Sequence, residues 1–207
     1  MMKTELYKKL EVYDFKSLFE KKKYAYFLRG DYNLNIIGVR KYVEGNKVTN
    51  LYDDYLVVIY NVEGKEHRDI YNITTEPGLS YMGDVMFNPK GTAILKPAQY
   101  RSSWVLGKHR GKYTALCQSK PVTVYRDNDK DKIYDLDPKK TTTGVYGINI
   151  HRSNEYYTRK TVDQYSGGCQ VFNDPKQFAQ FIKVCKKQEA LYGNSFTYTL
   201  LDEKDLI

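Results

Sequence analysis

The middle of the chain has the alternating and branched-apolar pattern of β-strands. Branched and aromatic residues gather in short segments that Gly, Pro, Asn and Asp separate, and no helical periodicity lies between them. The segments expected to be strands are 34–42, 55–62, 92–95, 113–118 and 121–126. Strands that succeed one another without intervening helices predict antiparallel or mixed β-structure rather than a βαβ repeat.

The N-terminal residues have a different period. Apolar residues fall at helical spacing over 4–22, and Gly30 ends the pattern, which predicts one N-terminal helix packed on the rest of the chain. The 207 residues then divide into a helical segment, 1–29, and one domain, 30–207, long enough to bury a core. The expected fold class is mainly β with a few helices, that is, α+β.

A second helix is signalled near the C-terminus. Asp174 is a suitable N-cap, Pro175 stands at the first helical position, and Gln177 has the spacing of a capping box. One apolar stripe comes next at helical spacing, formed by Phe178, Phe181, Ile182 and Cys185. A last strand is expected at 195–201.

Composition narrows the class of protein. The 21 Tyr and 8 Phe exclude a disordered polyelectrolyte, although 33 Lys+Arg against 25 Asp+Glu give a net charge of +8. The basic residues are scattered, which favours a solvated basic surface over a dedicated site for a polyanion such as nucleic acid, anionic lipid or an acidic cell-wall polymer. The longest apolar run, 55–60, is too short to cross a membrane, and no secretory signal is visible at the start. We therefore expect synthesis in a cytoplasm without a signal peptide and no membrane insertion.

The three cysteines are too few, and odd in number, for a disulfide framework. Cys185 belongs to the helical stripe and is expected in the core. Cys117 alternates with Tyr113 and Ala115, so we expect it to be buried and structural. Cys169 differs because two glycines precede it, and glycines allow the tight turn that leaves the next side chain accessible.

A histidine lies upstream of Cys169 in the chain. If residues 144–151 form a strand, His151 shares the less apolar face with Val145, Gly147 and Asn149. A core histidine with satisfied hydrogen bonds is the alternative interpretation. A strand-end histidine beside a Gly-Gly-Cys turn suits a Cys/His nucleophilic site better, because a thiol needs a base to react as the thiolate.

These residues resemble the signature of the L,D-transpeptidase catalytic domain. His151 is followed after fourteen residues by Ser166-Gly167-Gly168-Cys169, similar to the histidine, spacer and Ser-His-Gly-Cys of that family. Three further segments resemble a divergent branch associated with tailed phages and prophages: 90–95, 106–111 and 147–152. Two positions depart from the family pattern, since Gly167 replaces its histidine and Val171 replaces its usual Arg or Asn.

The resemblance implies a β-sandwich or barrel with a thiol active site. Cys169 is implied as nucleophile, His151 as its base and Ser166 as a site hydroxyl, with backbone N–H groups around Gly168 and Cys169 as the oxyanion hole. Arg152 and Gln170 are candidates for the missing polar contact with substrate. His109, in a Gly- and Lys-rich loop, is expected to border the cleft.

The function implied is cleavage of peptidoglycan peptide stems through an acyl-thioester. Hydrolysis is favoured over transpeptidation because the acceptor-side residues depart from the pattern and a phage context calls for lysis. The enzyme would reach the cell wall through the virion or the lysis machinery. The alternative is a non-enzymatic phage structural or binding protein that retains the fold and contacts other phage proteins.

An acidic loop is the main candidate for a metal site, and no other cofactor is expected. A zinc site that includes His151 and Cys169 is a weaker alternative, because no close pair of ligands supports it. Asp127, Asp129, Asp131 and Asp135 have the spacing of calcium ligands. The turn glycine and the bidentate glutamate of such a loop are Lys132 and Pro138 here. A solvated acidic loop is therefore the default interpretation, with calcium as the alternative.

Overall fold

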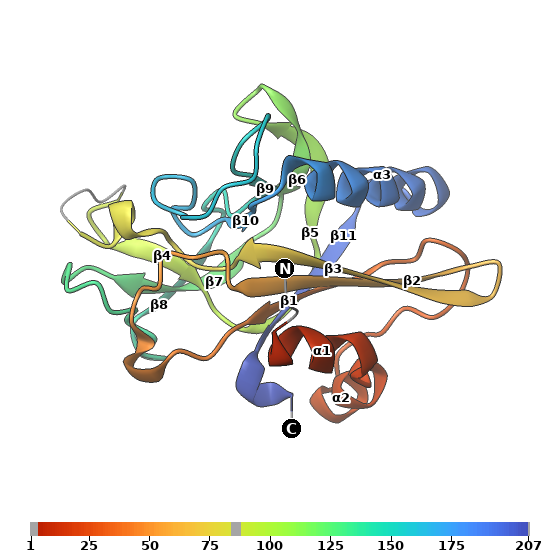
Figure 1. Ribbon diagram of the computed structural model, residues 1–207, viewed down its shortest axis with the longest axis horizontal. Helices are drawn as coiled ribbons and strands as arrows, with labels where there is room; N and C mark the ends of the chain where they lie inside the picture. Colours follow the sequence, from red (N-terminus) through yellow and green to blue (C-terminus); the bar gives the residue numbers. More distant parts are fainter. Residues whose placement is uncertain (1–3, 84–87, 207) are drawn as a thin grey trace.

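Eight strands close into a barrel in the computed structural model, which describes residues 4–83 and 88–206 (Figure 1). Around the barrel the strands run in the order β1, β11, β5, β6, β9, β10, β3 and β2. Their bounds are β1 Asn35–Arg40, β2 Asp54–Val62, β3 Lys65–Thr74, β5 Ala98–His109, β6 Tyr113–Gln118, β9 Ile150–Arg152, β10 Gln170–Phe172 and β11 Phe196–Asp202. The expected α+β class, mainly β, is confirmed.

A three-stranded sheet extends the barrel on one side. It has the order β4 (Thr92–Leu95), β7 (Val122–Asp127) and β8 (Thr141–Gly144), with antiparallel pairing throughout. Short 3₁₀ turns lie at Glu44–Asn46, Leu79–Tyr81 and Glu203–Asp205. The expected strands at 34–42, 55–62, 92–95, 113–118, 121–126 and 195–201 all correspond to strands of the structure. β3 and β5 were missed because charged and polar residues interrupt their apolar pattern.

The longest apolar run of the chain, 55–60, lies in β2, and both faces of this strand are covered. Leu56 and Val58 point into the barrel, where they belong to the same buried cluster as Trp104. Val57 and Ile59 point outward and are buried beneath the N-terminal helices. A strand that is buried on both faces needs apolar residues at consecutive positions rather than at alternate ones.

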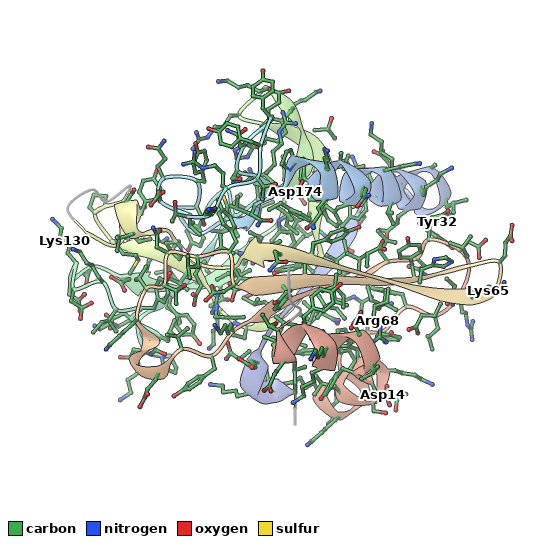
Figure 2. All side chains as sticks on the ribbon, viewed as in Figure 1. Asp14, Tyr32, Lys65, Arg68, Lys130 and Asp174 are labelled. Atoms are coloured by element: carbon green, nitrogen blue, oxygen red, sulfur yellow. The ribbon has the colours of Figure 1, made fainter. Side chains whose placement is uncertain are left out.

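Two N-terminal helices, α1 (Glu5–Val12) and α2 (Phe15–Lys22), cover that outer face (Figure 1). The prediction of a single helix over 4–22 is wrong. Tyr13 is extended, and the Asp14 side chain accepts a hydrogen bond from Ser17 N–H, so a second helix begins there. Arg68 of β3 secures the break by donating to the carbonyls of Leu10, Glu11 and Tyr13 (Figure 2).

The long helix α3 (Pro175–Tyr192) packs on the other side of β2 and β3 from α1 and α2 (Figure 1). Asp174 caps it as predicted, accepting hydrogen bonds from the N–H groups of Lys176 and Gln177 (Figure 2). The return half of the capping box does not form, because Gln177 Oε1 is buried without a partner among the described residues. The predicted stripe is confirmed, since all four of its side chains are buried: Phe178, Phe181, Ile182 and Cys185.

No helix in the described part of the chain is both long and apolar enough to cross a membrane.

Candidate active site

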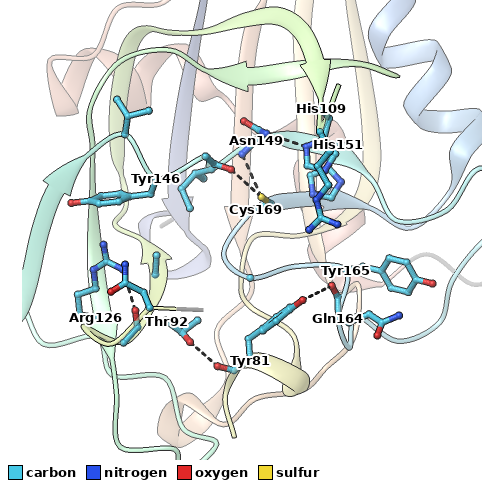
Figure 3. Close-up of a pocket in the computed structure, with 18 residues that line it drawn as sticks. Tyr81, Thr92, His109, Arg126, Tyr146, Asn149, His151, Gln164, Tyr165 and Cys169 are labelled. Carbon is cyan, nitrogen blue, oxygen red and sulfur yellow. Dashed lines mark hydrogen bonds between the residues drawn. The ribbon is translucent and has the colours of Figure 1, made fainter. Parts of the chain in front are cut away.

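A cavity of about 510 Å³ opens where the barrel meets the three-stranded sheet (Figure 3). Its walls come from β4, the end of β5, the segment 145–149 and the turn that precedes β10. Cys169, His151 and His109 all line it. These three residues were candidates from the sequence. They come from three separate segments of the chain, and the fold brings them to one cavity.

Parallel pairing of two short strands places the cysteine near the histidine. Gln170 of β10 lies opposite Ile150 of β9, and Val171 lies opposite His151. Cys169, one residue before β10, therefore lies beside Asn149, whose carbonyl accepts the Gln170 N–H at 2.9 Å. Seventeen residues lie between His151 and Cys169, and after β9 they form a loop that returns the chain to the neighbouring strand.

The turn that carries Cys169 is held by its own hydrogen bonds. Ser166 is fully buried; its hydroxyl donates to the Cys169 carbonyl at 2.8 Å and accepts the Gly168 N–H at 3.2 Å. Gly168 has φ +116°, and a Cβ at this position would lie 2.2 Å from the Ala93 carbonyl oxygen of β4. Only glycine fits here, both for its conformation and for its close approach to β4.

The segment 145–149 is a cavity wall rather than part of a continuous strand. The expected strand over 144–151 is wrong, because β8 ends at Gly144 and β9 begins at Ile150. The buried side chain of Gln118 holds the segment by accepting the N–H groups of Tyr146 and Ile148 at 3.0 and 2.9 Å. The side chain thus replaces a neighbouring strand for these backbone groups.

The Cys169 thiol is half-buried and hydrogen-bonded to this wall. Sγ lies 3.3 Å from the Gly147 carbonyl oxygen, to which it donates, and 3.5 Å from the Asn149 N–H, which it accepts. Burial raises the pKa of Cys169 to about 11, against the opposing effects of the Asn149 N–H and the Arg110 charge. In this structure the sulfur is therefore a protonated thiol at neutral pH.

The two histidines form a stacked pair, with ring centroids 4.0 Å apart and an angle of 20° between the rings. Burial is the main cause that lowers the pKa of His151 to about 3 and that of His109 to about 4, so both are neutral at pH 7. His151 Nδ1 lies 2.9 Å from the Arg152 carbonyl, which can only accept a hydrogen bond. Nδ1 therefore carries the proton, and Nε2 is the basic nitrogen.

His109 is the last residue of β5 rather than part of a loop; it is buried and lines the cavity. Its Nδ1 accepts a hydrogen bond from the Asn149 side-chain amide at 3.0 Å. The described contacts include no direct hydrogen bond between Cys169 and either histidine. The site therefore contains a neutral thiol and neutral imidazoles in one cavity, rather than a preformed thiolate–imidazolium pair.

Three of the side chains predicted for the site do not line the cavity. The Ser166 hydroxyl bonds only to backbone groups of its own turn. Gln170 is fully buried, donates towards the Thr75 and Gly168 carbonyls and accepts from Tyr198 Oη at 2.7 Å. Arg152 stacks on Tyr113 and pairs with Glu155 at 3.1 Å.

The Gly168 N–H, implied as an oxyanion donor, is also occupied, because it donates to Ser166 Oγ. The Asn149 N–H is the backbone donor that the structure directs at Sγ. Asn149 was placed on the His151 face from the sequence, but its role was not recognised. Arg126 and Tyr146 also line the cavity and were missed. Strand periodicity does not tell which face of the small sheet that contains Arg126 is covered, and Tyr146 lies in a segment that is not a strand.

The acidic loop does not assemble metal ligands in the structure. Asp127 accepts the Asp135 N–H at 2.8 Å, Asp131 accepts the Ile133 N–H at 2.8 Å, and Asp135 pairs with Lys140 at 2.9 Å. Across the described residues, no three His, Cys, Asp or Glu side chains gather as a metal site. Burial raises the pKa of Asp127 to about 6.

Cys117 is half-buried in β6 rather than fully buried as expected, and it does not line the cavity.

Comparison of the chain with known proteins finds no matching family model, no matching curated protein and no matching solved structure. The resemblance to L,D-transpeptidases thus depends on the residues of the motif and the segments quoted with it.

Proposed function

We propose that the chain is a cysteine-dependent cell-wall enzyme that hydrolyses peptide stems of peptidoglycan through an acyl-thioester. The observation that carries the proposal is the position of Cys169, on a rigid glycine turn in a 510 Å³ cavity that it shares with a neutral histidine. A neutral imidazole can accept the thiol proton, which an imidazolium cannot do. Access to the wall through a virion or the lysis machinery belongs to the same proposal.

The reaction begins with proton transfer from Sγ–H to His151 Nε2. The sulfur attacks the scissile carbonyl carbon, the C–N bond breaks, and the departing amine takes the proton from His151. Water then attacks the thioester and returns its proton through His151, which releases the acid and restores the thiol. Before this proton transfer, the substrate has to displace the hydrogen bond that the Cys169 thiol donates to the Gly147 carbonyl.

Activation of the thiol is the costly step. Forming the thiolate at pH 7 from a thiol of pKa about 11 costs about 5 kcal/mol. Transfer of the proton in step with attack avoids the free thiolate, and the Asn149 N–H stabilises charge that develops near the sulfur. Activation of the thiol in this site therefore depends on substrate binding. The dependence is stronger than in a site that already holds a thiolate–imidazolium pair before substrate binds.

The decisive experiment incubates the pure protein with defined muropeptides and identifies the products by mass spectrometry. We expect cleaved stems and, early in the reaction, an acyl adduct on Cys169. Cys169→Ala and His151→Ala should each abolish turnover, and the double variant should be little worse than either single one. Cys117→Ala, which removes the half-buried thiol outside the cavity, is the matched control and should retain turnover. Near wild-type turnover by Cys169→Ala would refute the thiol mechanism.

The second candidate is a non-enzymatic phage structural or binding protein. It is favoured by the protonated resting thiol and by a surface with several exposed aromatic side chains, among them Tyr42, Tyr156 and Tyr157. Such exposed tyrosines are typical of contact surfaces between proteins. Intact muropeptides after prolonged incubation with folded protein, and no adduct on Cys169, would favour this candidate.

A further inference from the structure

Arg126 of β7 lies in the wall of the cavity, and in Figure 3 it stands on the other side of Cys169 from the two histidines. Only 8% of Arg126 is exposed. Its Nε donates to Thr142 Oγ1 at 2.8 Å and its Nη1 donates to the Gly91 carbonyl at 3.1 Å. The guanidinium also lies over the Tyr146 ring, 4.5 Å from the centroid. The group is therefore held in one orientation.

The guanidinium has hydrogen-bonding capacity that the protein does not use. A guanidinium has five N–H donors, and the bonds to Thr142 and Gly91 leave one N–H on Nη1 and both on Nη2. No described residue accepts a bond from Nη2, and no carboxylate among the described residues pairs with Arg126. The free edge, formed by Nη1 and Nη2, has the geometry that binds a carboxylate through two parallel bonds.

The charge of the cavity agrees with this geometry. Its described lining includes two arginines, Arg110 and Arg126, and no Asp or Glu. Removing a charge from water without a counter-charge is costly, so a fixed and buried guanidinium facing a cavity is typical of a site for an anionic ligand. The positive cavity is not a consequence of the scattered basic surface, because Arg126 is buried among neutral groups.

We propose that Arg126 binds a free carboxylate of the substrate and selects acidic peptides for the cavity. The proposal rests on the proposed function, since it places a peptide between Arg126 and the Cys169–His151 side. Arg126 is then a specificity-determining residue, and the two bonds to Thr142 and Gly91 orient it before substrate arrives. Preorganisation of this kind reduces the entropy lost on binding.

The test measures binding of two probes by titration calorimetry. One is a stem peptide with its carboxylates free, and the other is the same peptide with all carboxylates converted to carboxamides. A charge-assisted pair predicts that wild-type protein prefers the acid about 10- to 100-fold. Arg126→Gln should reduce this preference to about one.

One control variant separates the carboxylate contact from a general effect of charge. Arg101→Gln removes the same charge from an exposed position outside the cavity. It should retain the preference. If Arg126→Gln does not fold, Arg126→Lys replaces it; a single ammonium cannot reproduce the two-point contact, so the preference should fall at least about threefold.

The result separates this inference from the proposed function. Preference that is lost in Arg126→Gln supports the inference even if no peptide is cleaved. Preference that persists in the folded Arg126 variants overturns it, even if wild-type protein cleaves stems. Absence of binding by either probe, or equal binding of both by wild-type protein, also overturns it.

Discussion

Replacement of Gly168 by alanine tests how the turn before Cys169 is built. Two separate costs are expected. An alanine at φ +116° is strained by about 1–3 kcal/mol, and its Cβ, 2.2 Å from the Ala93 carbonyl oxygen, adds about 1–3 kcal/mol of overpacking. Ala93 cannot move freely, because it pairs with Arg126 within the small sheet. Gly168→Ala should therefore lose about 2–6 kcal/mol of unfolding free energy.

Gly193→Ala is the matched control. Gly193 comes directly after α3 with φ +87°, and a Cβ there would meet no atom within 4 Å, so only the conformational cost applies. Urea unfolding can be monitored by the fluorescence of Trp104, which is the single tryptophan and is fully buried. Gly168→Ala should be less stable than Gly193→Ala by at least about 1 kcal/mol. In the folded Gly168→Ala protein, the rate at which Cys169 is alkylated should also differ from that of the wild-type protein. Equal losses in the two variants would refute the close approach of the turn to β4.

The buried groups give three further expected outcomes. Cys185→Ser should cost about 1–3 kcal/mol of stability, measured by urea unfolding, and leave the turnover of the folded fraction unchanged, because Cys185 is buried on α3 away from the cavity. Because the pKa of Cys169 is raised to about 11 and only the thiolate reacts, its alkylation by iodoacetamide should accelerate about tenfold per pH unit between pH 7 and 10; a rate that is flat from pH 6 to 8 would contradict this. Trp104→Phe should cost about 1–3 kcal/mol in urea unfolding monitored by circular dichroism, because Trp104 Nε1 donates to the Ile148 carbonyl at 2.7 Å; an unchanged midpoint would show that the bond adds no stability.

Local patterns were sufficient for the elements whose residues determine their own conformation. The helix that begins at Pro175 was predicted with its cap and its buried stripe, because capping and helical periodicity depend on neighbours in the chain. The apolar run in β2 marked a strand but not the number of covered faces. The single helix expected over 4–22 was wrong because Asp14 begins a new helix, whereas periodicity alone continues through it.

The residues of the candidate site show the same division. The sequence showed the glycines before Cys169 and the less apolar pattern around His151. Cys169 and His151 both line the cavity. The tertiary structure decided three further features of the site. His109 stacks on His151, Ser166 and Gln170 form hydrogen bonds within the turn and the barrel, and Arg126 lines the same cavity as the Cys169 thiol. The physical reason is register: the pairing of β9 with β10, and of β4 with β7, sets which side chains share a space, and strand register depends on contacts between residues far apart in the chain.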